Sequence, residues 1–513
     1  MNGAEALIAS LAEAGVDVVF ANPGTSEMQL VAAIDGQAGM RAVLGLFEGV
    51  VTGAADGYGR IADTPAATLL HLGPGLGNGL ANLHNARRAG SPIVNLVGDH
   101  ASDHLHHDAP LTSDVAGVAR PMSDWVGRSR SASDLPAAGM RALAAARSEG
   151  GGVATLIVPA DHAWSGPAFP ATAIPPVAMQ AVDDGAVSDA AEALRAPGSA
   201  LFLGGRALRA DALDVAGRIA AATGATLVCE TFCARIERGV GRVPVEKLPY
   251  FGEVAADFLS KFNSLVFVGA EPPVSFFAYP DKPGWLSPEQ ARLVRLAGKG
   301  DDALAALLAV ADRLDARSAS AALQPPAIPE VEAGKLTASN AAALLAHAMP
   351  EQAIICEEAA TAGVAFWHKT AGAAPHDWLM LTGGAIGQGL PLALGAAIAA
   401  PHRKVIALQA DGGGMYTLQA LWSMARERAN VTTIILNNGS YAILNIELMR
   451  VGVTDPGPKA RAMLDLRDPP IDWTALATGM GVEAVRASDT EQFGAALDRA
   501  IATVGPFLIE AMI

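Results

Sequence analysis

The chain of 513 residues is 51% hydrophobic and 17% charged, a composition typical of a globular protein with about two to four domains, each with its own core. Its 36 lysines and arginines against 52 aspartates and glutamates give a formal net charge of −16, which argues against nucleic acid or an anionic membrane as a partner. The sequence contains no uncharged apolar run of about 18 residues that would predict a membrane span.

The N-terminal residues and the cysteines bear on the cellular compartment. The first 19 residues contain three acidic side chains and no basic segment, so we expect no secretory signal. Cys229, Cys233 and Cys356 are the only cysteines, and their spacing suits neither a disulfide framework nor a zinc site. We therefore expect a cytoplasmic protein with reduced thiols.

Two segments rich in proline and alanine, 164–176 and 321–329, are typical of interdomain linkers. In each of the three parts that they separate, β-branched runs alternate with helical stretches rich in alanine and leucine, which is the pattern of parallel α/β sheets. We therefore predict an α/β protein of three parallel-sheet domains, at residues 1–165, 180–320 and 333–513.

Strands of the first domain are expected at 17–20, 67–70 and 92–97, and each leads into glycines and polar residues. Parallel strands deliver such residues to one edge of the sheet, where α/β proteins bind ligands. Thr25 follows the first of these strands and His71 follows the second. Both are candidate site residues.

Other ionisable side chains of the first domain are Glu48 and those of the segment His104-Leu105-His106-His107. Glu48 follows an apolar run and precedes an expected helix at 54–58, a position that suits a catalytic carboxylate or, alternatively, a helix cap. Imidazoles transfer protons near neutral pH, which makes His106 and His107 catalytic candidates. The alternative for these histidines is a solvated surface turn.

The middle domain offers less chemistry. Strands are expected at 200–203 and 264–268, but few reactive side chains follow them. We interpret this domain as structural. Its aromatic residues Phe276 and Phe277 are candidates for an apolar substrate lining.

The third domain contains a strand–helix–strand pattern at 404–409, 417–429 and 431–436. Such a βαβ unit is almost always right-handed and makes its two strands parallel. Asp411, after the first strand, and Asn438, after the second, are therefore expected at the same edge of the sheet.

These strand ends carry groups that suit a metal bound to phosphates. Asp411, Asn438 and Ser440 offer the hard oxygen ligands that Mg²⁺ prefers. Gly412 and Gly413 allow backbone N–H groups to approach an anion at the start of a helix. A plain turn without a ligand is the alternative.

The segment Ala410-Asp411-Gly412, followed by Asn437-Asn438 with 27 residues from Asp411 to Asn438, resembles the diphosphate-binding motif of thiamine-diphosphate (ThDP) enzymes. Ala410 replaces the first glycine of that motif. With its three α/β domains, the whole chain resembles the ThDP-dependent 2-oxo acid decarboxylases and acetolactate synthases. The resemblance implies ThDP and Mg²⁺ as cofactors, a pyrimidine-binding first domain and a diphosphate-binding third domain.

The same resemblance implies roles for individual residues. Glu48 corresponds to the family glutamate that activates the aminopyrimidine ring of the cofactor. Gly384 and Ile386 lie in a segment similar to the one that holds the cofactor in its bent shape. Tyr441 and Ile443 follow the metal motif and are expected to contact the cofactor.

Other residues distinguish the subfamilies. His71 resembles a histidine of benzoylformate decarboxylases, whereas His106 and His107 resemble the paired histidines of pyruvate decarboxylases. Thr25 keeps a hydroxyl for the substrate carboxylate. Leu444 stands where pyruvate decarboxylases hold a glutamate, so a proton donor is missing, and this absence favours carboligation over aldehyde release.

The resemblance leads to a function with alternatives. We expect decarboxylation of a 2-oxo acid and transfer of the aldehyde unit to an acceptor aldehyde or ketone, as in acetolactate synthase. The first alternative is a benzoylformate-type or aliphatic decarboxylase that releases the aldehyde, and the second is a ThDP-binding protein without turnover. Thr25, His71, Phe277, Ile443 and Leu444 are the expected substrate pocket, and the identity of the 2-oxo acid stays open.

The expected assembly also follows from the resemblance. Glu48 and Asp411 belong to different domains, which in the family meet across a subunit interface. We therefore expect a homodimer or homotetramer. The middle domain carries no recognisable FAD signature, and the sequence leaves open whether it binds a nucleotide.

Overall fold

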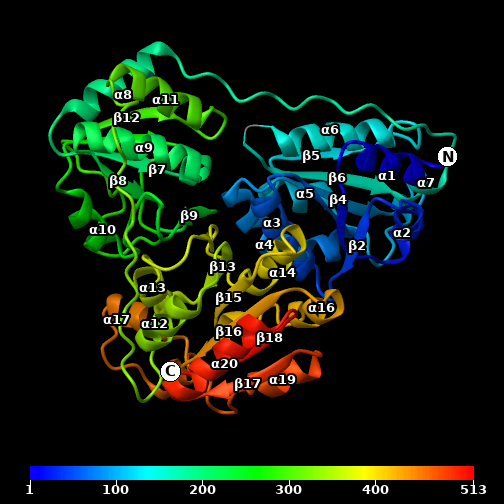
Figure 1. Cartoon of the computed structure of the whole chain (residues 1–513). Coiled ribbons are helices and arrows are strands. Elements are labelled where there is room, and N and C mark those ends of the chain that lie inside the picture. The colour runs from blue at the N-terminus through cyan, green and yellow to red at the C-terminus, as the bar shows by residue number, and fades with distance from the viewer. Residues whose placement is uncertain (149) are drawn as a thin grey trace.

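The computed structural model describes residues 1–148 and 150–513 and contains three β-sheets flanked by helices (Figure 1). Elements of the first sheet are blue and cyan in Figure 1, those of the second are mostly green, and those of the third run from yellow-green to red, apart from the green β9. All strand pairs are parallel except one at the edge of the third sheet. This arrangement confirms the predicted fold class.

The first sheet has the strand order β2-β1-β3-β4-β6-β5. Its strands are β1 Val18–Asn22, β2 Arg41–Leu44, β3 Ala66–Leu70, β4 Ile93–Asp99, β5 Trp125–Arg128 and β6 Val153–Pro159. Its helices are α1 Gly3–Glu13, α2 Met28–Asp35, α3 Glu48–Ala62, α4 Leu72–Ala89, α5 Val115–Ala119, α6 Leu135–Arg147 and α7 Ala160–Trp164, with 3₁₀ turns η1 Thr25–Glu27, η2 Leu105–His107 and η3 Arg120–Met122.

The second sheet has the order β10-β8-β7-β11-β12. Its strands are β7 Ser199–Leu203, β8 Thr226–Cys229, β10 Glu246–Lys247, β11 Ser264–Val268 and β12 Arg292–Ala297. Its helices are α8 Asp184–Arg195, α9 Ala210–Thr223, α10 Gly252–Leu259 and α11 Ala303–Arg313, with the 3₁₀ turn η4 Gly205–Leu208.

The third sheet has the order β17-β18-β16-β15-β13-β14-β9, and β9 pairs with β14 in the antiparallel direction. Its strands are β9 Ile236–Arg238, β13 Ala353–Glu358, β14 His376–Met380, β15 Val405–Ala410, β16 Val431–Asn437, β17 Glu483–Ala487 and β18 Phe507–Met512. Its helices are α12 Ala338–Ala348, α13 Ala360–Lys369, α14 Gly389–Ala399, α15 Asp411–Gly414, α16 Ala420–Glu427, α17 Ala442–Arg450, α18 Pro458–Ala462, α19 Trp473–Gly479 and α20 Thr490–Ala502. The third sheet thus takes β9 from the sequence of the expected middle domain.

Central strands are buried at every residue, as in β3, β4, β6, β13 and β14. Strands covered by helices on both faces need apolar side chains on both, which explains why these segments read as continuous hydrophobic runs. Among the helices of the described chain, none combines the length and the apolar composition needed to cross a membrane.

Two helices differ from the sequence prediction. The helix expected at 54–58 begins earlier, because α3 starts at Glu48 itself. The helix expected at 417–429 is shorter in the structure, where α16 spans Ala420–Glu427 and the single turn α15 precedes the expected range. Between them, the Thr417 hydroxyl donates to the Gly387 carbonyl at 2.8 Å, which holds the intervening chain in a non-helical path.

Helices α3 and α14 join the first and third sheets. A Cβ atom on Gly57 would overlap the carbonyl oxygen of Leu392, and one on Gly395 would overlap that of Ala54. Glycine allows the two backbones to approach this closely. The hydrophobic core is therefore continuous from α3 to α14.

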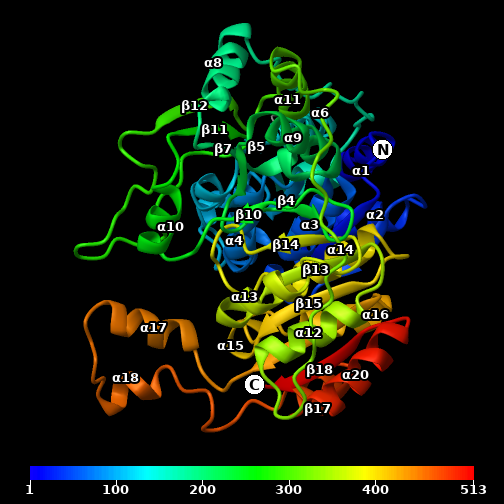
Figure 2. The same cartoon turned by 60° about the vertical axis from the view of Figure 1, so that its left-hand side comes forward.

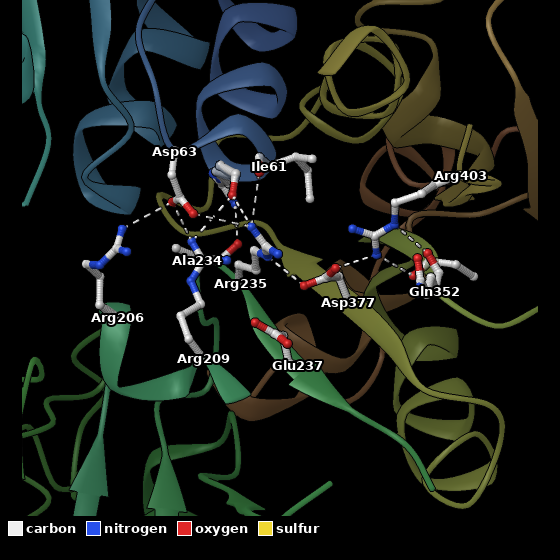
Figure 3. A network of polar contacts seen from close by, with 12 residues as sticks. Ile61, Asp63, Arg206, Arg209, Ala234, Arg235, Glu237, Gln352, Asp377 and Arg403 are labelled. Atoms are coloured by element: carbon white, nitrogen blue, oxygen red, sulfur yellow. Dashed lines mark hydrogen bonds and ion pairs between the residues drawn. The ribbon is translucent and has the colours of Figure 1, made fainter. Parts of the chain in front are cut away.

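An ion-pair network joins all three sheet regions (Figure 3). Asp63, which caps α3, pairs with Arg209 of the second region at 3.0 Å, and Arg235 pairs with Asp377 of β14 at 2.5 Å. Burial alone would raise the pKa of the Asp377 carboxyl, but Arg235 and Arg403 hold it below its usual value. The network borders a cavity of about 950 Å³ between the first and second sheets.

Candidate active site

Glu48 lies at the N-terminus of α3, directly after the extended residue Phe47. Its side chain is almost buried, and Oε2 accepts a hydrogen bond from Nδ2 of Asn78 in α4 at 3.0 Å. A Cβ on Gly75 would lie 3.0 Å from Glu48 Oε1 and 3.3 Å from the Cβ of His71. The glycine turn at the start of α4 therefore brings Glu48 and His71 to the same place.

His71 contacts a buried carboxylate that the sequence analysis missed. Its Nδ1 lies 2.7 Å from Oε2 of Glu27, whose side chain is fully buried. Glu27 also accepts hydrogen bonds from the Gly24 N–H at 2.8 Å and the Ser26 hydroxyl at 2.5 Å. With Nδ1 held by this carboxylate, the other ring nitrogen of His71, Nε2, is left for a ligand.

Two glycines make room for this pair. A Cβ on Gly24 would overlap the His71 ring, and a Cβ on Gly98 would overlap the Glu27 carboxylate. Gly24 and Gly98 come from the ends of different strands, β1 and β4. The local signal for Glu27 was its place in Gly24-Thr25-Ser26-Glu27, the same strand end that drew attention to Thr25.

The other predicted residues of the first domain are exposed. Thr25 begins η1 and faces solvent. His106 and His107 lie in η2, where their ring centroids are 3.8 Å apart. Their described contacts join them to each other and to His104, not to His71 or Glu48. Within one chain, their exposure agrees with the alternative of a surface turn.

At the third sheet, Asp411 and Asn438 follow the neighbouring parallel strands β15 and β16. Asp411 is 2% exposed, and its Oδ2 accepts the Gly439 N–H at 2.9 Å. Burial raises the pKa of the Asp411 carboxyl, which its hydrogen bonds from backbone N–H groups partly oppose. The expected meeting of the two strand ends is therefore present.

The side-chain oxygens of Asn438 and Ser440 differ in exposure and in the hydrogen bonds that they already make. The Asn438 side chain is exposed and its Oδ1 accepts the Ser440 N–H at 2.9 Å. The Ser440 hydroxyl donates to the Leu464 carbonyl at 3.1 Å and accepts from Asn445 Nδ2 at 2.9 Å. As a metal ligand, Ser440 has only one lone pair left on its hydroxyl.

The donor set fits Mg²⁺ bound together with a diphosphate. Among the described residues, no group of three histidines, cysteines or acidic residues forms a metal cluster. Mg²⁺ does not need one, because it is commonly held by one or two carboxylates, water and phosphate oxygens. Asp411 supplies a carboxylate here and Asn438 an amide oxygen. A Cβ on Gly412 would lie 2.5 Å from the Tyr441 ring, so glycine keeps this turn closely packed.

The segment with Gly384 and Ile386 is held from two sides. Glu358, at the end of β13, accepts the N–H groups of Gly387 at 2.7 Å and Gly389 at 2.6 Å. From the first region, Asn85 in α4 donates to the Ala385 carbonyl at 2.8 Å. Ile386 projects from this segment and is 37% exposed. Sequence reasoning had found neither Glu358 nor Asn85.

The predicted apolar lining is only partly brought together. The Cε1 atom of Phe276 lies 3.4 Å from the position that a Cβ atom on Gly384 would occupy. Phe277 is 58% exposed, and its ring centroid lies 6.4 Å from that of Phe276. Ile443 and Leu444 lie in the first turn of α17, and Leu444 is 45% exposed. Phe276 therefore borders the Gly384 segment more closely than the predicted Phe277.

Both sides of this site match models of one protein family. Residues 1–117 match the model described as thiamine pyrophosphate enzyme, N-terminal TPP binding domain. Residues 361–511 match the corresponding C-terminal TPP binding domain. The first match contains Glu48 and His71, and the second contains Asp411 and Asn438.

Full-length relatives point the same way. A protein of Mycobacterium tuberculosis, provisionally named acetolactate synthase large subunit IlvX, is 52% identical over 515 residues, covering 100% of this chain and 99% of its own. Benzoylformate decarboxylase of Pseudomonas aeruginosa is 31% identical, with 97% and 96% covered. The solved structure of a thiamine diphosphate-dependent 4-hydroxybenzoylformate decarboxylase from Rhodococcus jostii RHA1 matches with a TM-score of 0.87 at 26% identity, covering 100% of this chain and 99% of that one.

Proposed function

Since this chain belongs to the thiamine-diphosphate-dependent enzymes of the acetolactate synthase and benzoylformate decarboxylase family, we propose that it decarboxylates a 2-oxo acid with ThDP and Mg²⁺ and releases an aldehyde. The observation that carries this proposal is the contact between His71 and the buried Glu27, beside Glu48. A titratable imidazole held by a carboxylate, next to the glutamate that activates the cofactor, suits a proton-transfer step.

Each of these residues has a separate role in the proposed reaction. ThDP, when bound, supplies the electron sink that lets the substrate carboxylate leave as CO₂. Asp411 and Asn438 hold the diphosphate through Mg²⁺, and Glu48 binds the aminopyrimidine ring. The Thr25 hydroxyl binds the substrate carboxylate. His71 Nε2 then donates the proton that replaces CO₂ on the carbonyl carbon, so that one 2-oxo acid anion and one proton yield one aldehyde and one CO₂.

Carboligation is the second candidate, and Leu444 favours it. Its aliphatic side chain follows the metal motif in the first turn of α17 and offers no proton. The relative that is 52% identical also carries an acetolactate synthase name. In this alternative the aldehyde unit forms a carbon–carbon bond with a second carbonyl compound instead of taking a proton.

A panel of 2-oxo acids, with and without acceptor aldehydes, tests both candidates when CO₂ and the products are quantified by mass. His71→Ala is expected to lower aldehyde formation more than CO₂ formation and to raise the share of carboligated product when an acceptor is present. Failure to form CO₂ from any aliphatic or aromatic 2-oxo acid, with both cofactors supplied, would overturn the proposed function.

We also propose that the working unit is at least a homodimer, with Glu48 of one chain facing Asp411 of another. Supporting this proposal, α17 and α18 extend from the body of the molecule (Figure 2), and neither contains a buried residue in the single chain. Met449 and Met463 in this region are 57% and 73% exposed. Apolar side chains this exposed are typical of surfaces that pack against a partner.

Mixing two inactive variants tests this assembly directly. In a mixed dimer of Glu48→Gln and Asp411→Ala chains, a site shared across the interface combines the intact Glu48 of one chain with the intact Asp411 of the other. Activity should therefore return when the chains are dissociated and reassembled together. If each site lay within one chain, every site would keep one defect and no activity would return.

A further inference from the structure

We propose that the protein has a second binding site, for a small organic anion with an apolar body, in the cavity between β9, β10 and α13. This cavity has a volume of about 360 Å³, within the range of small-molecule sites. Its lining combines the cations Arg238, Arg242 and Lys247 with the apolar surfaces of Val243 and Trp367. The inference is independent of the proposed reaction.

Arg238 is the main reason for assigning an anion. The residue is 9% exposed, and its guanidinium lies 3.8 Å from the centroid of the Trp367 ring. Nη2 donates to the Trp367 carbonyl at 2.7 Å, whereas the buried Nη1 has no hydrogen-bond partner among residues 1–148 and 150–513. A buried cation without a counter-charge is costly, and an anion in the cavity would provide both the charge and the acceptor.

Lys247 adds a second cation on the same side. Its Nζ lies 4.6 Å from the centroid of the Trp367 ring, and within the described chain it forms no ion pair. The buried carboxyl of Glu357 interacts with it only at longer range. The guanidinium of Arg238 and the ammonium of Lys247 thus both lie near the aromatic ring of Trp367.

Two carboxylates near the cavity pair with cations other than Arg238 and Lys247. Glu246 lies 3.7 Å from Lys261, and Glu237 lies 3.7 Å from Arg242. His368 also lines the cavity and lies within range of both cations. Burial, followed by Lys247 and Arg238, lowers the pKa of His368. A ligand with a single carboxylate and an aliphatic or aromatic body would therefore match both the charge and the apolar lining.

Benzoate and isovalerate are suitable probes, with benzamide and isovaleramide as neutral controls of the same shape. Calorimetry and the change in intrinsic tryptophan fluorescence, to which Trp367 contributes, report binding to the full-length protein. We expect saturable binding of the carboxylates and at least about tenfold weaker binding of the amides, because a charge-assisted hydrogen bond is lost. Equal binding of acids and amides, or no saturable binding, would overturn the assignment.

Two variants locate the binding. Arg238→Gln and Lys247→Gln should each weaken benzoate binding by about tenfold or more. Arg317→Gln removes an exposed cation paired with Asp312 elsewhere on the surface and should leave the affinity unchanged. Because Lys247 lies on a short edge strand, its variant tests the site even if Arg238→Gln does not fold. Wild-type affinity in a folded Lys247→Gln protein, or in both variants, would contradict the proposal.

The same experiment must distinguish binding in this cavity from binding at the catalytic centre. Binding is therefore measured in the Glu48→Gln and Thr25→Ala proteins as well, since both residues belong to the proposed active site. The affinity of the Arg238 cavity should be the same in these proteins as in the wild type. Loss of all benzoate binding in Thr25→Ala would show that the anion binds at the active site instead.

Discussion

The edges of the first and third sheets carry the two parts of the proposed active site, and they are built differently. At the first sheet, side chains hold side chains: Asn78 donates to Glu48, and the buried Glu27 holds His71. At the third sheet, Asp411 binds a backbone N–H of the next strand end, and Asn438 is exposed. The first edge is therefore preorganised by the protein alone, whereas the third presents oxygen atoms and backbone groups that suit a metal and a diphosphate.

The largest expected effect separates chemistry from binding at these two edges. Glu48→Gln keeps the shape of the side chain and its contact with Asn78, but it removes the carboxylate that acts on the cofactor. We expect turnover to fall by on the order of 10²-fold or more, with most of the ThDP affinity retained. Steady-state kinetics beside calorimetric titration with ThDP and Mg²⁺ measure the two quantities, and a parallel loss of affinity would contradict this role.

Asp411→Ala tests the other side of the comparison. Removing the carboxylate takes away a proposed metal ligand, so Mg²⁺-dependent ThDP affinity should fall by about tenfold to a hundredfold, and turnover should recover partly at high cofactor concentration. Titrations at several Mg²⁺ concentrations measure this change. Asp214→Ala is the matched control, because that partly exposed carboxylate pairs with Arg218 on α9, in the second sheet region. Unchanged affinity in the Asp411 variant would remove Asp411 from the metal site.

Glu27→Gln tests whether the preorganised contact between Glu27 and His71 contributes to proton transfer. The amide can still accept a hydrogen bond from His71 but no longer stabilises its charged form, so aldehyde formation should slow by about tenfold while CO₂ formation slows less. Product ratios in the presence of an acceptor aldehyde measure this partition. Glu192→Gln, the same substitution at an exposed carboxylate that pairs with Arg292 in the second sheet region, should leave the ratio unchanged. An identical ratio in Glu27→Gln would make the pair structural only.

The smallest effect is expected at the exposed histidines. His106→Ala should change turnover and the product ratio by no more than about twofold, because His106 contacts only His107 in the described structure. The same assays measure it beside His71→Ala. If His106→Ala lowered turnover as much as His71→Ala, His106 would belong to the catalytic centre. It would then have to reach that centre in a neighbouring subunit of the assembly.

The sequence was most informative where function depends on the ends of strands. The runs before Asp411 and Asn438 predicted β15 and β16, their parallel pairing and the edge at which the two residues meet. Long apolar runs are readable because strands covered on both faces exclude polar side chains. The first residue of α3 was less readable, since the helix begins at Glu48 rather than at 54.

Residues that act through long-range contacts were not predictable. Glu27 and His71 are 44 positions apart, and their contact depends on Gly24 and Gly98, whose missing side chains make the space for it. Glu358 reaches Gly387 across 29 positions. The strand end that contains Glu27 was visible in the sequence, but its burial against His71 was not, because burial with a particular partner is a property of the folded chain.

The sequence alone determined the fold class, the family resemblance and the candidates Glu48, His71, Asp411 and Asn438, because these depend on local periodicity and on spacing along the chain. Only the tertiary structure decided which candidates have partners. It placed Glu27 beside His71 and left His106 and His107 exposed to solvent. It also brought β9 of the middle segment to the third sheet, where Nη1 of Arg238 has no hydrogen-bond partner among the described residues. The physical reason is that hydrogen bonding and charge compensation depend on distances between segments far apart in sequence, which no local pattern records.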